Sequence, residues 1–380
     1  MARDISKRIS RLQSRRTGMD RYMALDEAAR VEVLAKSMAQ ERWQKRASAD
    51  KSYTRYALGA MQEVGADQTR ISLDTAERVG RQLEQGFAAK GRSVEFRLQG
   101  SVPLNVHIRR YSDVDLLTLD QGFLTYSNVG ILARQGRYIY PTKERSVDRL
   151  LQLRRDAEGI LKTAYPAAAV DTSGSKAINV SGGSLARPVD VVPSHWYDTV
   201  DWQLSQQEAD RAVTILDKSV PRTLDNWPFR HIQKVTERCH MTLGGTRKAI
   251  RLAKSVKCDA EADGVMIHLP SFDIAGLMYH ADQTLLIAGA RYELAILAET
   301  QRWLDQLSRN RAQAEALRTP DNTRAIIDSP AKFDGLVNLS KEVDDLLVEV
   351  AKEQAPWIGL NPTFDTCRNV LLSLVIAEAA

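Results

Sequence analysis

The chain has 380 residues, of which 43% are hydrophobic and 27% charged, so it is long enough for two lobes with hydrophobic cores and too apolar to be disordered. No apolar run approaches the length of a membrane span and the N-terminus lacks the apolar centre of a signal peptide, so we expect a cytoplasmic protein that does not bind a membrane. The three cysteines are too few and too scattered for a disulfide framework or a four-ligand zinc site.

The net charge of +5 comes from the N-terminus, where residues 1–56 hold 14 basic and 7 acidic side chains. Four arginines recur there near helical spacing: Arg8, Arg11, Arg15 and Arg16. Such a run is usually a solvated helix face, and contact with nucleic-acid phosphates is the open alternative. The remainder holds 39 basic and 41 acidic residues, which disfavours a polymerase that tracks long RNA along a basic groove.

The first half of the chain has helical and strand patterns that predict a mixed sheet. Amphipathic spacing predicts helices over 24–46 and 72–90, and the second ends before Gly91. Alternating patterns predict strands near 94–99, 113–119, 168–173 and 188–192, with a helix over 146–165.

From about residue 206 onward, apolar positions recur at helical spacing, in segments 212–216, 249–256, 274–279, 285–307 and 343–350. We therefore expect an α+β protein with its site between two lobes. The predicted parts are N-terminal helices over 1–70 that pack on or bridge the lobes, a catalytic lobe over 71–205, and a helical lobe over 206–380.

The most informative motif is Gln99-Gly100-Ser101 followed by Asp113-Val114-Asp115. Successive side chains of a strand point to opposite faces, so the two aspartates share one face while the valine between them points to the core. Glycine allows close backbone approach to a phosphate, and exposed N–H groups and a serine hydroxyl donate hydrogen bonds to it. The motif predicts a phosphate-binding turn beside a pair of carboxylates.

A third carboxylate, Asp190, lies in an apolar strand bounded by prolines, where an ionised group needs a partner. Oxygen ligands of this kind suit Mg²⁺, which binds through a few carboxylates together with substrate phosphates, and Mn²⁺ is an alternative. We predict that Asp113, Asp115 and Asp190 hold two metal ions, which can activate a hydroxyl nucleophile and stabilise a leaving pyrophosphate.

At these residues the chain resembles the DNA polymerase β-like nucleotidyltransferase superfamily, whose signature is Gly-Ser, a variable loop, an acidic pair one residue apart and a later single carboxylate. Within it, the chain looks most like the CD-NTases, the bacterial relatives of cyclic GMP-AMP synthase and oligoadenylate synthetase. The matching segments are 99–101, 112–117, 176–178 and 189–193. The resemblance implies a polymerase β-like lobe with a mixed sheet, packed against an all-helical lobe like that of oligoadenylate synthetase.

A second resemblance lies in the helical half, where the family uses a lysine and a serine to contact the donor triphosphate. Segments 251–254 and 269–272 are similar to these regions, which implies Lys254 and Ser271 as triphosphate-binding residues beside Gln99, Gly100 and Ser101. The family commonly has an aromatic residue just after the lysine. Because this chain departs from that pattern, Lys257 stays open as the alternative contact.

The resemblance implies a metal-dependent enzyme that condenses nucleoside triphosphates, ATP and GTP among them, into a cyclic di- or oligonucleotide second messenger for anti-phage (CBASS) signalling. It also implies regulatory or effector proteins of a defence operon as partners. Three alternatives stay open: an enzyme that extends RNA ends, such as a tRNA nucleotidyltransferase or poly(A) polymerase, a transferase that adenylylates a protein or small molecule, and a catalytically silent nucleotide-binding scaffold. The sequence does not determine the bases, ring size or linkage of a product.

Overall fold

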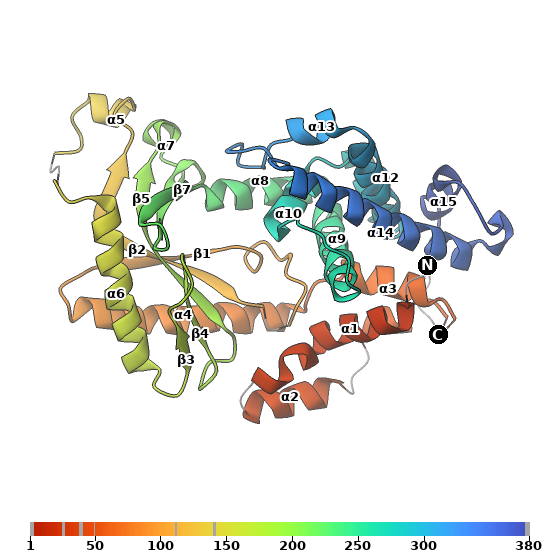
Figure 1. The fold of residues 1–380 in the computed structure, drawn as a ribbon, viewed down its shortest axis with the longest axis horizontal. Helices are drawn as coiled ribbons and strands as arrows, with labels where there is room; N and C mark the ends of the chain where they lie inside the picture. Colours follow the sequence, from red (N-terminus) through yellow and green to blue (C-terminus); the bar gives the residue numbers. More distant parts are fainter. Residues whose placement is uncertain are drawn as a thin grey trace.

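The computed structural model describes residues 4–24, 27–37, 41–48, 50–110, 112–139 and 142–376. Within these ranges the chain forms a lobe built on one sheet and a lobe built of helices, and the N-terminal helices pack along the helical lobe (Figure 1). No helix among the described residues is long and apolar enough to cross a membrane.

The sheet has seven strands among the described residues: β1 (Val94–Gln99), β2 (Val114–Tyr126), β3 (Ala169–Asp171), β4 (Ile178–Ser181), β5 (Val189–Asp198), β6 (Ala212–Asp217) and β7 (Arg222–Asn226). The long strand β5 lies at its centre and pairs in parallel with β2. Its first half also pairs with β4, and its second half with β6, both antiparallel. The predicted mixed sheet is therefore confirmed.

Two long helices, α4 (Ala66–Ala88) and α6 (Ser146–Ala164), cover one face of the sheet (Figure 1). Their apolar residues recur at helical spacing and are fully buried, as Leu83 on α4 and Leu153 on α6 illustrate. They pack against alternate residues of the strands, such as Val114 and Val189. Burial of these valines holds the flanking aspartates at the edge of the apolar layer.

The helical lobe follows β7 and contains α8 (Pro228–Met241), α9 (Gly245–Ala262), α10 (Ser271–Tyr279), α11 (Gln283–Ala288), α12 (Ala295–Arg309), α13 (Arg311–Ala316), α14 (Pro330–Gln354) and α15 (Phe364–Leu371). These helices share one hydrophobic core with α1 (Ile5–Thr17) and α3 (Ser52–Met61). The remaining short elements are α2 (Glu27–Ser37), α5 (Ile131–Arg134), α7 (Val200–Ser205), and the 3-10 turns η1 (Met19–Ala24), η2 (Arg42–Lys45), η3 (Glu208–Asp210) and η4 (Pro356–Ile358).

Several sequence predictions differ from the structure. The helical segment predicted at 212–216 is the strand β6, which is buried at every position, and both β6 and β7 extend the sheet. A short, mostly apolar run has no clear period, so pairing with β5 decided its conformation. The predicted helix over 285–307 is two helices separated by a turn, and 24–46 contains α2 and η2, with residues 25–26 and 38–40 outside the described ranges. The division of the chain at residue 205 stays a prediction, although strands on both sides of it belong to one sheet.

The N-terminal arginines are internal ion-pair partners. Arg15 forms a buried bidentate pair with Asp259 at 2.6 and 2.8 Å, and Arg8 pairs with the buried Glu342 at 2.6 Å. Arg11 pairs with Asp263 on the same side of α1. Because these guanidinium groups fasten α1 to the helical lobe, this part of the basic N-terminus does not offer them to nucleic-acid phosphates.

Candidate active site

The pairing of β2 with β5 brings two of the predicted carboxylates together. Asp115 on β2 and Asp190 on β5 occupy opposite positions of the parallel pair, one residue beyond the buried valines. On the other side of β2, Gln99 at the end of β1 lies opposite Asp115. Asp113 directly precedes β2 and, two residues before Asp115, lies on the same face. Two segments far apart in the sequence, one with Asp113 and Asp115 and the other with Asp190, therefore bring three aspartates to one edge of the sheet.

The turn after β1 requires glycine for two reasons. Gly100 has φ +82°, in the left-handed region that side chains disfavour. A Cβ at this position would lie 2.1 Å from Oδ2 of Asp115, much closer than atoms can approach. The bare backbone of the turn thus leaves room for the carboxylate and directs the following Ser101 toward the same pocket.

The carboxylates of the three aspartates accept few hydrogen bonds. No described residue donates one to the side-chain carboxylate of Asp115, and Oδ1 of Asp113 is buried without a hydrogen-bond partner in the described part of the chain. Asp190 accepts one bond, at 2.8 Å, from the side-chain amide of Asn179 on β4. Burial and the neighbouring charges of Asp190 and Asp113 raise the pKa of Asp115 to about 7. Burial likewise raises the pKa of Asp190 above its usual range.

This donor set fits divalent cations. Clustered carboxylate oxygens that lack protein donors suit a hard cation, and an ion would favour their charged forms. In the described ranges, no group of three or more His, Cys, Asp or Glu side chains is arranged so that it could hold a metal ion by itself. Water and substrate phosphates would therefore have to supply the remaining ligands, which is the usual arrangement for Mg²⁺ at phosphate-transfer sites.

A pocket of about 450 Å³ lies between the two lobes beside these carboxylates. The catalytic lobe contributes Gln99, Gly100, Ser101 and Asp115 to its wall, and the helical lobe contributes Lys254 and Ser271. All five residues that the sequence proposed as nucleotide-binding therefore line one pocket with one of the three proposed metal ligands.

Lys254 lies on α9 and is only 8% exposed. Its ammonium group donates a 2.7 Å hydrogen bond to the carbonyl of Val106, in the loop after the phosphate turn. Burial, with the nearby charges of Arg251 and Lys257, lowers its pKa to about 8. Lys257 instead pairs with Glu261 at 3.4 Å, so the structure places Lys254 and not Lys257 on the pocket wall.

Several pocket residues were missed by the sequence analysis. Phe272 follows Ser271 at the start of α10 and stacks on His231 of α8, with ring centroids 4.2 Å apart. Burial lowers the pKa of His231 to about 4, so the ring is neutral. Further lining residues are Asn226, Trp227 and Asp321. Phe272 could have been predicted as a pocket residue because it follows Ser271 directly, whereas no sequence pattern marks His231 or Asp321 as pocket residues.

Trp196 on β5 is an aromatic residue near the site that could in principle stack on a base. Its side chain is 5% exposed, its indole N–H donates to Glu95 at 2.5 Å, and Arg211 lies 4.5 Å from the ring centroid. Its side chain packs in a small apolar cluster with Leu117 and Val213, separate from the cluster under α4 and α6, and it does not line the pocket.

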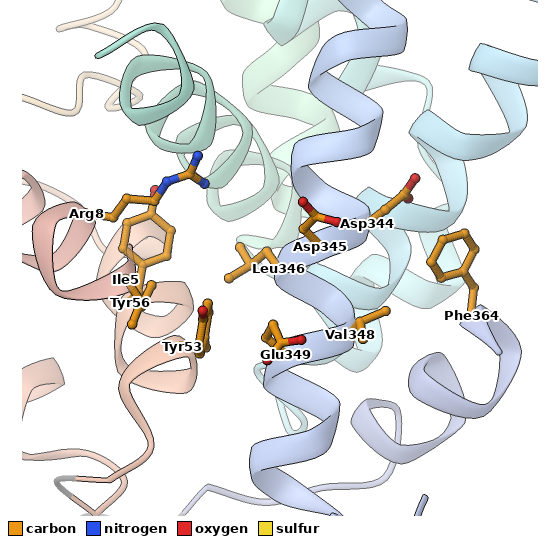
Figure 2. Close-up of a pocket in the computed structure, with 10 residues that line it drawn as sticks. All are labelled: Ile5, Arg8, Tyr53, Tyr56, Asp344, Asp345, Leu346, Val348, Glu349 and Phe364. Atoms are coloured by element: carbon orange, nitrogen blue, oxygen red, sulfur yellow. The ribbon is translucent and has the colours of Figure 1, made fainter. Parts of the chain in front are cut away.

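A second cavity, of about 270 Å³, lies between α14 and the N-terminal helices α1 and α3 (Figure 2). Its most buried polar groups are already paired: Arg8 with Glu342, and the Tyr56 hydroxyl with Asp259 at 2.6 Å. The pocket between the lobes, by contrast, has the cluster of three aspartates and the phosphate turn beside it, which distinguishes it as the candidate active site.

The comparisons with known proteins agree with this geometry. No protein-family model matches the chain. Over 336 residues, however, it is 41% identical to the cyclic dinucleotide synthase CdnE of Yersinia aleksiciae, a match that covers 88% of this chain and 84% of the relative. The chain belongs to the CD-NTase family. CD-NTases are divalent-metal-dependent nucleotidyltransferases that take nucleoside triphosphates and make cyclic oligonucleotides.

Solved CD-NTase structures show the same fold. The STING-associated CdnE c-di-GMP synthase from Flavobacteriaceae sp. superposes with a TM-score of 0.72 at 18% identity, over 93% of this chain and all of that one. The corresponding enzyme from Capnocytophaga granulosa gives a TM-score of 0.68 at 23% identity, over 90% and 97% of the two chains. The expected CD-NTase architecture, a mixed-sheet lobe against a helical lobe, is thus confirmed.

Proposed function

We propose that this CD-NTase condenses two nucleoside triphosphates into a cyclic dinucleotide second messenger, with Asp113, Asp115 and Asp190 as ligands of two Mg²⁺ ions. The observation that carries the assignment is the register of β2 and β5, which sets Asp115 beside Asp190 at the wall of a nucleotide-sized pocket. Relatives named cyclic dinucleotide synthase and c-di-GMP synthase support this product class.

In the proposed reaction, a ribose hydroxyl of one nucleotide attacks the α-phosphorus of the other; the bond to the β-phosphate breaks and pyrophosphate leaves. When bound, the metal ions supply activation of the hydroxyl and neutralisation of the leaving group. Ser101 and the backbone at Gly100 hold the triphosphate from the sheet side, and Lys254 and Ser271 from the helical side. A repeat of the step with exchanged roles closes the ring and releases the second pyrophosphate.

The biological role is proposed to be anti-phage (CBASS) signalling, in which an effector protein reads the product. The similarity to two enzymes described as STING-associated supports it. The arginines Arg8 and Arg15 of α1 are buried in ion pairs and so are not available to RNA phosphates, which favours this role over an RNA-end nucleotidyltransferase.

The test is incubation with all four labelled ribonucleoside triphosphates and Mg²⁺ or Mn²⁺ without template, followed by phosphatase treatment and mass spectrometry. We expect phosphatase-resistant cyclic dinucleotides, and no product after EDTA treatment or in Asp190→Asn. Asp148→Asn, which removes an exposed carboxylate on α6, is the matched control and keeps its activity. Products that form only with added RNA would overturn the proposal, as would full activity in Asp190→Asn.

A further inference from the structure

The 3-10 turn η1 (Met19–Ala24) lies against the proposed metal site. Helix α1 ends at Gly18, whose φ of +92° reverses the chain direction into η1. This places Nη1 of Arg21 3.5 Å from Oδ1 of Asp113. That oxygen is the buried carboxylate atom that has no hydrogen bond among the described residues, so the guanidinium is its nearest described counter-charge.

Two further contacts hold η1 beside the loop that carries Asp113. Asp20 pairs with Arg109 of that loop, and the backbone N–H of Arg110 donates to the carbonyl of Arg15 at 2.9 Å. Since Arg15 is itself anchored in the core through Asp259, the end of α1 is fixed. The turn η1 beyond it is held by the partly exposed pair of Asp20 with Arg109 and by Arg30, which donates to the carbonyls of Tyr22 and Met23. Arg21 is therefore held close to the metal-binding edge by a short segment whose contacts are partly exposed.

We propose that Arg21 is a tethered counter-cation that occupies the metal edge of Asp113 before catalysis and competes with divalent ions for it. The inference rests on the proposed function, because it takes Asp113 as a metal ligand. A metal-free site holds three neighbouring carboxylates, and one guanidinium partly offsets their repulsion. A divalent ion on the same carboxylate repels the guanidinium, so η1 moves away as the ion binds.

The ion pair between Arg21 and Asp113 is weak enough to break when a metal ion binds. The Arg21 and Asp113 side chains are 38% and 39% exposed, so solvent screens their attraction. A weakly held cation beside one metal ligand lowers metal affinity without blocking the site, and so delays metal binding until nucleotide-bound metal arrives.

The test measures Mn²⁺ binding to the full chain without nucleotide, through loss of the free Mn²⁺ signal in electron paramagnetic resonance. We expect Arg21→Ala to bind Mn²⁺ about fivefold more tightly than the unaltered protein, with a difference that shrinks at high salt. Arg81→Ala removes an equally charged, exposed ion-pair partner on α4 and serves as the matched control, with affinity unchanged within about twofold. Hydrogen exchange of residues 19–24 should rise on addition of Mn²⁺, and not in Asp113→Asn.

Equal or weaker Mn²⁺ binding in a folded Arg21→Ala variant overturns the inference and leaves the proposed function intact, since the carboxylates would still bind metal. Failure of the unaltered protein to bind Mn²⁺ in a manner that depends on Asp113 and Asp190 overturns both. Protection of residues 19–24 that increases with Mn²⁺ also contradicts the inference, because η1 would then close over the ion.

Discussion

Substitution of Gly100 by alanine isolates the geometric role of the phosphate turn. The new Cβ would lie 2.1 Å from Oδ2 and 3.1 Å from Cγ of Asp115, so either the turn or the carboxylate must move by about 1 Å to restore a normal contact. Either movement separates the phosphate-binding backbone from the proposed metal ligand. A displacement of about 1 Å in a catalytic constellation costs on the order of 100-fold in rate.

The positive φ of Gly100 adds a separate cost of about 1–2 kcal/mol in stability for any side chain. Gly182 provides the control for this part: its φ is +75° and a Cβ there meets no atom within 4 Å. Gly182→Ala should therefore lose similar stability and keep its rate. Gly100→Ala should lose similar stability and about 100-fold in rate, equivalent to about 2.7 kcal/mol of transition-state stabilisation.

The assay follows the initial rate of phosphatase-resistant product at saturating nucleoside triphosphate and Mg²⁺, with urea unfolding to compare stability. Equal rates for the two alanine variants would refute the argument, because the left-handed backbone alone would then explain the glycine. A rate loss in Gly100→Ala that higher Mg²⁺ fully restores would assign the defect to metal affinity.

Three further predictions follow from the charges. The raised pKa of Asp115, about 7 against an ordinary 3.8, means that folding takes up a proton between these values, so the free energy of unfolding in EDTA falls as pH rises through that window. The stability of Asp115→Asn relative to the unaltered protein should thus grow by roughly 2.6 kcal/mol from pH 5 to pH 8, and parallel stability curves would contradict it. Lys254→Gln should raise the KM for nucleoside triphosphate about tenfold while Lys257→Gln changes it less than about twofold; the reverse order would show that the other lysine makes the contact. Arg15→Met leaves the buried Asp259 unpaired and should lower the free energy of unfolding by about 3–5 kcal/mol in urea titrations, whereas a loss below about 1 kcal/mol would mean that the pair is not buried in solution.

Some helices and strands can be predicted from local sequence alone, and others cannot. The predicted strand at 94–99 and helix at 146–165 match β1 and α6 closely, because each has a clear period and ends at a glycine or proline signal or a change of pattern. The strand β6 was mistaken for a helix because all of its positions are buried, which removes the alternation that identifies a strand. Burial on both faces is a property of the sheet and not of the six residues.

The arginines of α1 show that sequence alone also cannot tell whether a charged side chain is exposed or paired inside the protein. Their spacing correctly indicated one helix face, and sequence alone favoured a solvated one. Their partners Asp259 and Glu342 lie on α9 and α14, so only the packing of three helices could show that the face is internal. Arg21, which no motif marks, gained its position beside Asp113 in the same way.

By itself, the sequence determined the chemical character of the site. A strand has a side-chain period of two, so Asp113 and Asp115 had to share a face, and the glycine before Ser101 had to mark a turn of unusual backbone. Only the tertiary structure decided that Asp115 lies beside Asp190, and that Lys254 closes the pocket from the other lobe. Register and lobe packing depend on contacts between distant segments, which no local pattern of residues specifies.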